Sequence, residues 1–209
     1  MKRHTLNILL ILMVGLFIQS CAPSITLDAR WKSPDQDAMK PEKIFVIVVG
    51  ENMRSRQLAE DAFEVALRAK GFAAVGALET LPTSENVDSA TFRRIVKDKG
   101  CDAVLTARAV NVNTEQRWVP GTYSPPSYYG SYYGYYGYHG YYGMSSPGYM
   151  DETTTALLES NLFDARGDSG HLAWVGQSSV IVSGSTEKLV EKYAAVVVQG
   201  MIDDGVLTP

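Results

Sequence analysis

Histidines and known catalytic motifs are the first places to look for chemistry in this sequence, and both are sparse. The three histidines are His4, His139 and His171, and no two of them stand at the spacing of a metal site. The chain has no Gly-x-Ser-x-Gly nucleophile elbow, no phosphate-binding loop and no dinucleotide-binding fingerprint. We therefore expect a non-enzymatic protein without catalytic residues, a bound metal or a cofactor.

Neighbouring carboxylates are the next candidates for acid–base chemistry. Glu60 and Asp61 are adjacent in a predicted helix. Consecutive helical side chains point about 100° apart, so these two do not converge on one substrate. We expect both to face solvent, as we do for Asp203 and Asp204 near the C-terminus. The Gly/Ser-rich stretch 182–185 precedes a predicted helix and could hold an anion, but it is more typical of a helix N-cap.

Cys21 carries the clearest chemical signal. The preceding Ile18-Gln19-Ser20 resembles the lipobox of bacterial lipoprotein signals, which has a branched apolar residue and then a small residue before the cysteine. The chemistry needs a thiol because diacylglycerol is attached through a thioether, and the small Ser20 lets the peptidase reach the bond. We predict cleavage between Ser20 and Cys21 and acylation of Cys21. The alternatives are a plain signal peptide, or a membrane-buried N-terminal helix with an incidental cysteine.

Residues 1–20 have the organisation of a signal peptide. Lys2 and Arg3 form a basic start, and residues 6–18 are a run of 13 residues that is apolar apart from Asn7. A bilayer-spanning helix needs about 20 residues, so the run fits the apolar centre of a signal. Lipoprotein processing usually leaves three acyl chains, and two already give stable anchoring. Ala22 stands where an aspartate favours inner-membrane retention in enterobacterial lipoproteins, which implies the outer membrane, facing the periplasm.

Charge and cysteine content restrict the partners further. The formal net charge is −4 and no Lys/Arg cluster is present, so nucleic-acid binding is not expected. If Cys21 is acylated, Cys101 has no partner in the chain and no internal disulfide forms. Cys101 opens an apolar strand, so we expect it to be a small buried hydrophobe rather than a reactive thiol.

Residues 21–43 are interpreted as an acylated N-terminus and tether, and residues 44–209 as a single α/β domain. The predicted elements of this domain follow the order β-α-β-α-β-β-β-α. This order predicts a mixed sheet of about five strands with a parallel first half and an antiparallel hairpin at the end. Helices are expected to pack on this sheet. Trp31 and Trp174 are expected to be core or edge anchors rather than ligand platforms. Hydrophobic periodicity predicts strands at 43–49, 72–77, 102–113, 153–163 and 172–182, and helices at 55–70, 89–99 and 187–203.

Residues 117–150 interrupt this pattern. They hold 11 of the 12 tyrosines, many in Tyr-Tyr-Gly steps, and almost no aliphatic residues. Such a segment cannot build a core of its own, so we predict a mobile low-complexity insertion. Its aromatic rings could stack on sugars, pack against a partner protein or self-associate, or the expansion has no role. The candidate binding residues are Tyr128, Tyr129, Tyr132, Tyr133, Tyr135, Tyr136, Tyr141 and Tyr142.

Several short motifs occur in order along the mature chain. They are the lipobox, Ala29-Arg30-Trp31-Lys32-Ser33-Pro34, Lys43-Ile44-Phe45-Val46-Ile47-Val48, Glu60-Asp61, Gly100-Cys101-Asp102-Ala103-Val104-Leu105 and Leu172-Ala173-Trp174-Val175-Gly176. In this order they resemble a family of envelope lipoproteins of unknown function in Gram-negative bacteria. The resemblance implies a fold and a location but no mechanism. The Tyr/Gly insertion lies outside the shared core of that family.

Three hypotheses for the function follow. The first is a membrane-anchored envelope lipoprotein with a non-enzymatic binding or structural role, attached to the membrane through acyl chains on Cys21 and binding peptidoglycan or an envelope protein. The second is a homo-oligomeric subunit of an assembly or secretion apparatus, with the Tyr/Gly loop as contact surface. The third is a hydrolase with an unrecognised site, which predicts a cleft with converging polar groups at the carboxyl ends of the parallel strands.

Overall fold

The computed structural model describes residues 25–34, 37–50, 52–81, 88–120, 122–124, 144–167 and 170–209. The predicted cleavage site at Ser20 and Cys21 lies outside the described residues. So do His4, His139 and the eight candidate tyrosines of the Tyr/Gly segment. The tether, the sheet and the flanks of the insertion can be compared with the sequence predictions.

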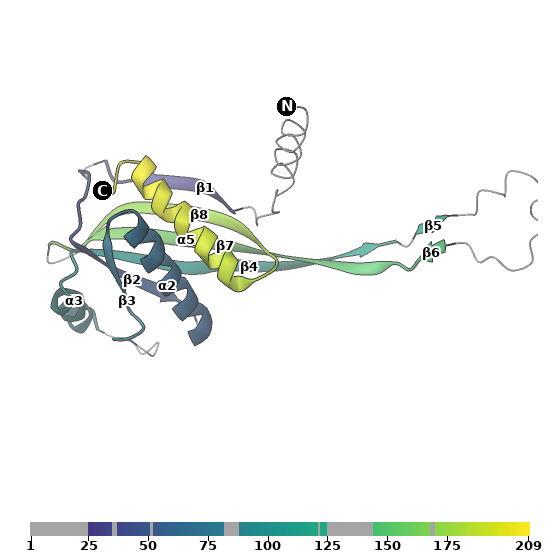
Figure 1. Cartoon of the computed structure of the whole chain (residues 1–209), viewed down its shortest axis with the longest axis horizontal. Coiled ribbons are helices and arrows are strands. Elements are labelled where there is room, and N and C mark those ends of the chain that lie inside the picture. Colours follow the sequence, from purple (N-terminus) through teal and green to yellow (C-terminus); the bar gives the residue numbers. More distant parts are fainter. Residues whose placement is uncertain are drawn as a thin grey trace, which may run out of the picture.

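A six-stranded mixed sheet with the order β1-β8-β7-β4-β2-β3 forms the body of the protein (Figure 1). Strand β2 pairs in parallel with both β3 and β4, and the remaining neighbours are antiparallel. This confirms the predicted α/β class, the parallel first half and the β7–β8 hairpin. The strands are β1 (Ile25–Lys32), β2 (Lys43–Val49), β3 (Ala73–Gly76), β4 (Ala103–Val119), β7 (Tyr149–Asp164) and β8 (His171–Val182).

The sixth strand, β1, comes from the segment that was predicted to be a tether. Its residues pair with β8 from Ile25↔Val180 to Lys32↔Trp174, with one irregularity between Leu27 and Ala29. The prediction was wrong for Ile25–Lys32 because this short strand is mostly exposed and lacks a continuous apolar run. Its place is determined by long-range backbone hydrogen bonds to β8, which local periodicity does not record.

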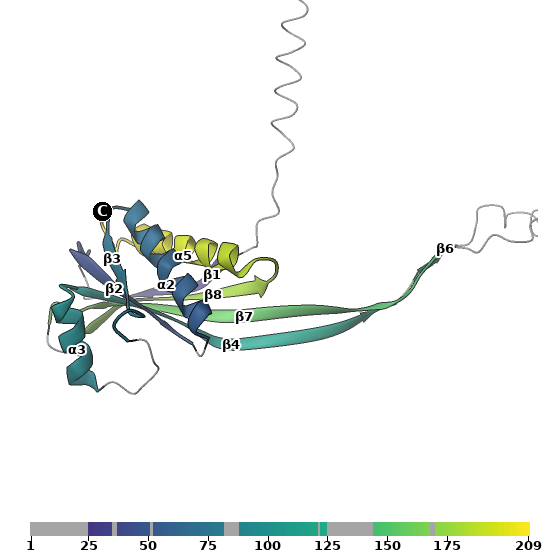
Figure 2. The ribbon, with the colours of Figure 1, turned by 60° about the horizontal axis from the view of Figure 1, so that its bottom comes forward.

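Helices cover the two faces of the sheet unequally. Helix α2 (Met53–Ala69) and helix α5 (Thr186–Asp203) lie side by side on one face, and helix α3 (Ser89–Asp98) lies on the other (Figure 2). The larger core lies beneath α2 and α5, where the rings of Phe63 and Tyr193 meet edge to face at 5.5 Å. A smaller core of Phe45, Val104 and Val96 lies beneath α3.

Tyr193 ties α5 to the sheet by a polar contact inside the larger core. Its hydroxyl lies 2.6 Å from the Ser160 hydroxyl of β7. Burial raises the pKa of Tyr193 to about 12, since the phenolate would lose its hydration. The pair therefore stays neutral at physiological pH and holds α5 against β7.

Strands β4 and β7 continue well past their neighbours as a two-stranded arm. Strand β2 pairs with β4 only as far as Arg108, and β8 pairs with β7 only from Thr154 onward. We call the free part, Glu115–Val119 paired with Tyr149–Thr153, the arm. It extends away from the body and leads to a short second ladder of β5 (Thr122–Ser124) and β6 (Met144–Ser146) (Figure 1).

The arm revises the predicted boundaries of the insertion. The strand expected to end at Asn113 continues to Val119, and the strand expected to begin at Thr153 begins at Tyr149. The ends of the predicted 117–150 insertion are therefore paired strand. Polar residues on both faces hid this from periodicity, because an isolated ribbon has no buried face to impose apolar alternation.

Candidate functional site

Glu60 is buried, which corrects the prediction that it faces solvent. Its side chain is 2% exposed, and its two carboxylate oxygens accept the backbone N–H groups of Val48 at 3.2 Å and Leu78 at 2.8 Å. Arg56 lies 3.7 Å away and donates through Nε to the Val48 carbonyl at 2.9 Å. Asp61, in contrast, is exposed as predicted. The two carboxylates do not form a pair, and Glu60 holds the end of β2 against the turn after β3.

The electrostatics of Glu60 reflect competing effects. Burial raises the pKa of its carboxyl group, while the backbone N–H groups of Leu78 and Val48 and the Arg56 guanidinium act in the opposite direction. Each of its oxygens accepts a backbone N–H group, so the carboxylate is held in place by the fold. We interpret Glu60 as a structural residue rather than a general acid.

Side chains of α2 also close the outer edge of β3. Glu64 accepts the Gly76 N–H at 2.7 Å, and Arg68 donates to the Ala74 carbonyl at 3.0 Å. Arg68 and Glu64 also form an ion pair with each other. An edge strand whose backbone groups are occupied this way is protected against pairing with another chain. The opposite edge, β1, has its outer side unpaired within the described residues.

The two tryptophans named from the sequence have different surroundings. Trp174 is fully buried under α5, and its indole N–H donates to Asp204 at 2.8 Å. Asp204 also pairs with Arg30 at 3.1 Å, so the expectation of a solvated Asp204 was wrong. Asp203 is exposed, as predicted. Trp31 is 47% exposed on the edge strand, which leaves its ring free for contacts outside the chain.

The Gly/Ser stretch before α5 behaves as a helix start. Ser185 occupies the N-cap position, but its side chain makes no capping bond to the backbone; its hydroxyl donates to Glu187 at 2.6 Å. The described residues contain no group of three or more His, Cys, Asp or Glu side chains that could hold a metal. His171 is exposed at the start of β8, and it belongs to no such group.

A hollow of about 810 Å³ lies beside α3, and Cys101, just before β4, is one of the residues that line it. Its wall is largely apolar and contains Phe92, Val104 and Phe163. Burial raises the pKa of the Cys101 thiol, which favours its protonated form. Cys101 is a free cysteine and is buried, as predicted.

Polar groups around this hollow are already engaged. The Asp102 carboxylate accepts the backbone N–H groups of Glu42 and Lys43 at 3.0 and 3.1 Å. Arg166 forms an ion pair with Asp164. The hollow also lies at the amino-terminal end of β4, whereas the hydrolase hypothesis places a cleft at the carboxyl ends of the parallel strands.

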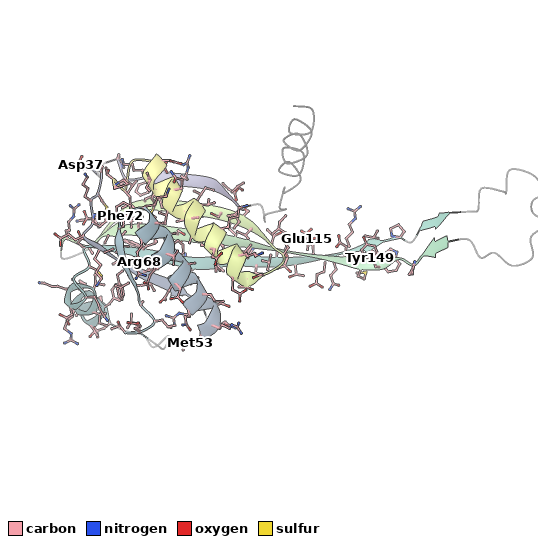
Figure 3. All side chains as sticks on the ribbon, viewed as in Figure 1. Asp37, Met53, Arg68, Phe72, Glu115 and Tyr149 are labelled. Atoms are coloured by element: carbon pink, nitrogen blue, oxygen red, sulfur yellow. The ribbon has the colours of Figure 1, made fainter. Side chains whose placement is uncertain are left out.

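The arm carries three exposed apolar or aromatic side chains close together, beside the half-buried Val119. Trp118 pairs with Met150 across the two strands, and Val119 pairs with Tyr149. Trp118 and Tyr149 are each 59% exposed, and Met150 is 54% exposed. We call these four residues the distal patch. Figure 3 shows Glu115 and Tyr149 on the arm, outside the part of the molecule that the helices cover.

Nearer the body, the arm is polar and its side chains pair across the strands. Gln116 donates to Glu152 at 3.1 Å, and the hydroxyls of Thr114 and Thr154 lie 3.0 Å apart. Arg117 stands opposite Asp151 in the register. These pairs keep the ribbon in register without a core. Sequence reasoning missed Trp118 and Met150 as candidates because the neighbouring tyrosines dominate the composition.

No protein-family model matches the chain, and no curated protein matches it. Among solved structures it is similar to a PelC dodecamer from Paraburkholderia phytofirmans, at 14% identity and TM-score 0.43 over 83% of this chain and 97% of that chain. It is also similar to the lipoprotein GNA1162 from Neisseria meningitidis, at 18% identity and TM-score 0.40 over 77% and 98%. Likenesses this distant carry no functional argument.

No helix in the described part of the chain is long and apolar enough to cross a membrane. The candidate functional surface among the described residues is the arm with its distal patch.

Proposed function

We propose that the chain is an acylated envelope lipoprotein that acts by binding, with the arm as its contact surface. The observation that supports this most directly is the distal patch: four adjacent apolar or aromatic residues on a ribbon that leaves the body of the protein. Exposed apolar patches of this kind mark interaction sites in soluble domains. The lipobox at Ile18–Cys21 supplies the anchor in this proposal.

The anchor is tested by the intact mass of the protein extracted from membranes. We expect wild type to begin at Cys21 and to carry the added mass of acyl chains, and Cys21→Ser to lose that mass. Cys101→Ser is the matched control and should keep it, because Cys101 is buried in the folded domain. A wild-type mass equal to the full chain, or to an unacylated cleaved chain, overturns the anchor and the proposed location at the outer membrane.

An oligomeric assembly subunit is the second candidate. The outer edge of β3 argues against one form of such an assembly. Arg68 and Glu64 occupy backbone groups of this strand, and Glu60 occupies a backbone N–H just after it, so another strand could not pair there. A ring made by joining β1 of one copy to β3 of the next is therefore disfavoured, and an oligomer would use the arm or the β1 edge. The molecular mass in mild detergent separates a monomer from an oligomer.

A further inference from the structure

The arm projects from the end of the body at which β1, the first described strand after the predicted anchor, begins. Ile25 of β1 pairs with Val180, Val180 with Ala156, and Ala156 with Val112, so these four residues form one row across the sheet. Strand β1 runs from this row away from the arm, and β4 runs from it into the arm. The N-terminal end of β1 at Ile25 and the arm therefore lie toward the same end of the sheet.

The chain between the anchor and this row is short. Cys21 stands four residues before Ile25, and four residues span at most about 14 Å even when fully extended. Strand β4 advances seven residues from Val112 to Val119, which is about 24 Å at the rise of an antiparallel strand. The distal patch therefore reaches farther from the row than acylated Cys21 can. A protein anchored through Cys21 with its strands directed at the membrane brings the patch to the bilayer.

The distribution of charge along the arm agrees with a contact between the distal patch and the bilayer. The pairs Val119–Tyr149 and Trp118–Met150 are apolar or aromatic, and charged residues begin at the next pair toward the body, Arg117 and Asp151. The ladder of β5 (Thr122–Ser124) and β6 (Met144–Ser146), which lies farther out than these pairs, has no charged residue either. Tryptophan and tyrosine are enriched at the membrane–water interface. In the sequence, residues 118–150 contain no Asp, Glu, Lys or Arg.

We propose that the distal patch, Trp118, Val119, Tyr149 and Met150, inserts into the lipid interface beside the acylated Cys21 and forms a second contact with the bilayer. This inference rests on the proposed function, because the acyl anchor sets the distance to the membrane. The attraction is apolar rather than electrostatic, since the arm carries three carboxylates, on Glu115, Asp151 and Glu152, against the single cation of Arg117. Binding therefore does not require anionic lipids.

Two tryptophans make a matched pair of reporters. Trp31 and Trp118 each lie six residues from the row, at about 20 Å on opposite sides of it, and both are about half exposed. Trp174 is fully buried and contributes the same background to both measurements. The full-length acylated protein is reconstituted into zwitterionic vesicles whose phospholipid is brominated near the headgroup, and tryptophan fluorescence is recorded. Trp31→Phe leaves Trp118 as the exposed reporter, and Trp118→Phe leaves Trp31.

We expect the Trp31→Phe protein to lose a large part of its emission in brominated vesicles and the Trp118→Phe protein to lose none. In the Trp31→Phe background, Met150→Asp places a charge in the patch and should abolish the quenching. Asn113→Asp adds the same charge near the base of the arm and should leave the quenching unchanged. Equal quenching of the two reporters, or none of Trp118, overturns the inference.

The outcomes also separate this inference from the anchor. An acylated protein whose Trp118 is not quenched retains the anchor and loses the membrane contact of the arm. An unacylated protein whose Trp118 is still quenched on addition of vesicles retains the contact and loses the anchor. Blue-shifted Trp118 emission without quenching, together with cross-linking between copies through Tyr149→Cys, would assign the patch to a second copy of the chain and overturn the lipid contact.

Discussion

Trp174 illustrates how single residues set the packing of this domain. Its ring lies over Gly176, where an added Cβ would come within 2.2 Å of a ring carbon. Gly200 on α5 is similarly restricted, because a Cβ there would lie 2.4 Å from a Leu27 methyl group and 3.7 Å from the Trp174 ring. The two glycines let a large aromatic side chain fit between sheet and helix, and Asp204 satisfies its indole N–H.

Gly176→Ala is therefore expected to destabilise the fold by about 1–3 kcal/mol, the usual cost of overpacking a core. The Trp174 ring is fully buried and cannot swing away from the new methyl group. Urea unfolding measures the change in the free energy of unfolding. Gly167→Ala is the control, because nothing lies within 4 Å of its added Cβ, and it should change stability by less than about 0.5 kcal/mol. Equal effects of the two substitutions would contradict this packing argument.

At the scale of the element, β4 is one strand with two environments. Its first residues, Ala103, Val104 and Leu105, are buried between β2 and β7, whereas the strand is exposed from Arg108 through Trp118. In the body β4 pairs with both β2 and β7, whereas in the arm it pairs with β7 alone. Isolated two-stranded ribbons are marginally stable in water.

Amide hydrogen exchange should reveal this division along β4. In the detergent-solubilised protein we expect slow exchange in the segment 103–107 and much faster exchange in 115–119, because the arm opens without disturbing the core. The segment 160–164 of β7, paired with the protected part of β4, is the internal reference. Mass spectrometry of proteolytic fragments resolves the two segments. Equally slow exchange in both would show that the arm is covered by another part of the protein or by a second copy.

At the scale of the molecule, the body and the arm are separable. The arm begins at the pair Glu115–Thr153, one pair beyond Thr154, the last residue of β7 that pairs with β8. The cores beneath α2 and α5 and beneath α3 contain no residue of the arm. The stability of the body is thus independent of the surface that we propose contacts the membrane.

Replacing residues 115–153 by a short Asn-Gly turn between the paired Thr114 and Thr154 tests this separation. We expect the body to fold with a free energy of unfolding within about 1 kcal/mol of wild type, since no core contact is lost and shortening a loop carries a small entropic gain. Thermal and urea unfolding measure it, with Gly176→Ala as a destabilised reference. A loss of several kcal/mol, or failure to fold, would show that the removed segment contributes to the core.

The sequence by itself determined the α/β class, the parallel first half, the β7–β8 hairpin and the buried state of Cys101. These features arise from local periodicity and from turns, which act over a few residues. Long-range pairing settled the rest: β1 became an edge strand through β8, and β4 and β7 extended each other into the arm. Glu60 and Asp204 were decided by tertiary structure as well. A carboxylate is buried only where distant backbone or side-chain donors meet it, and the positions of those donors exist only in the folded chain.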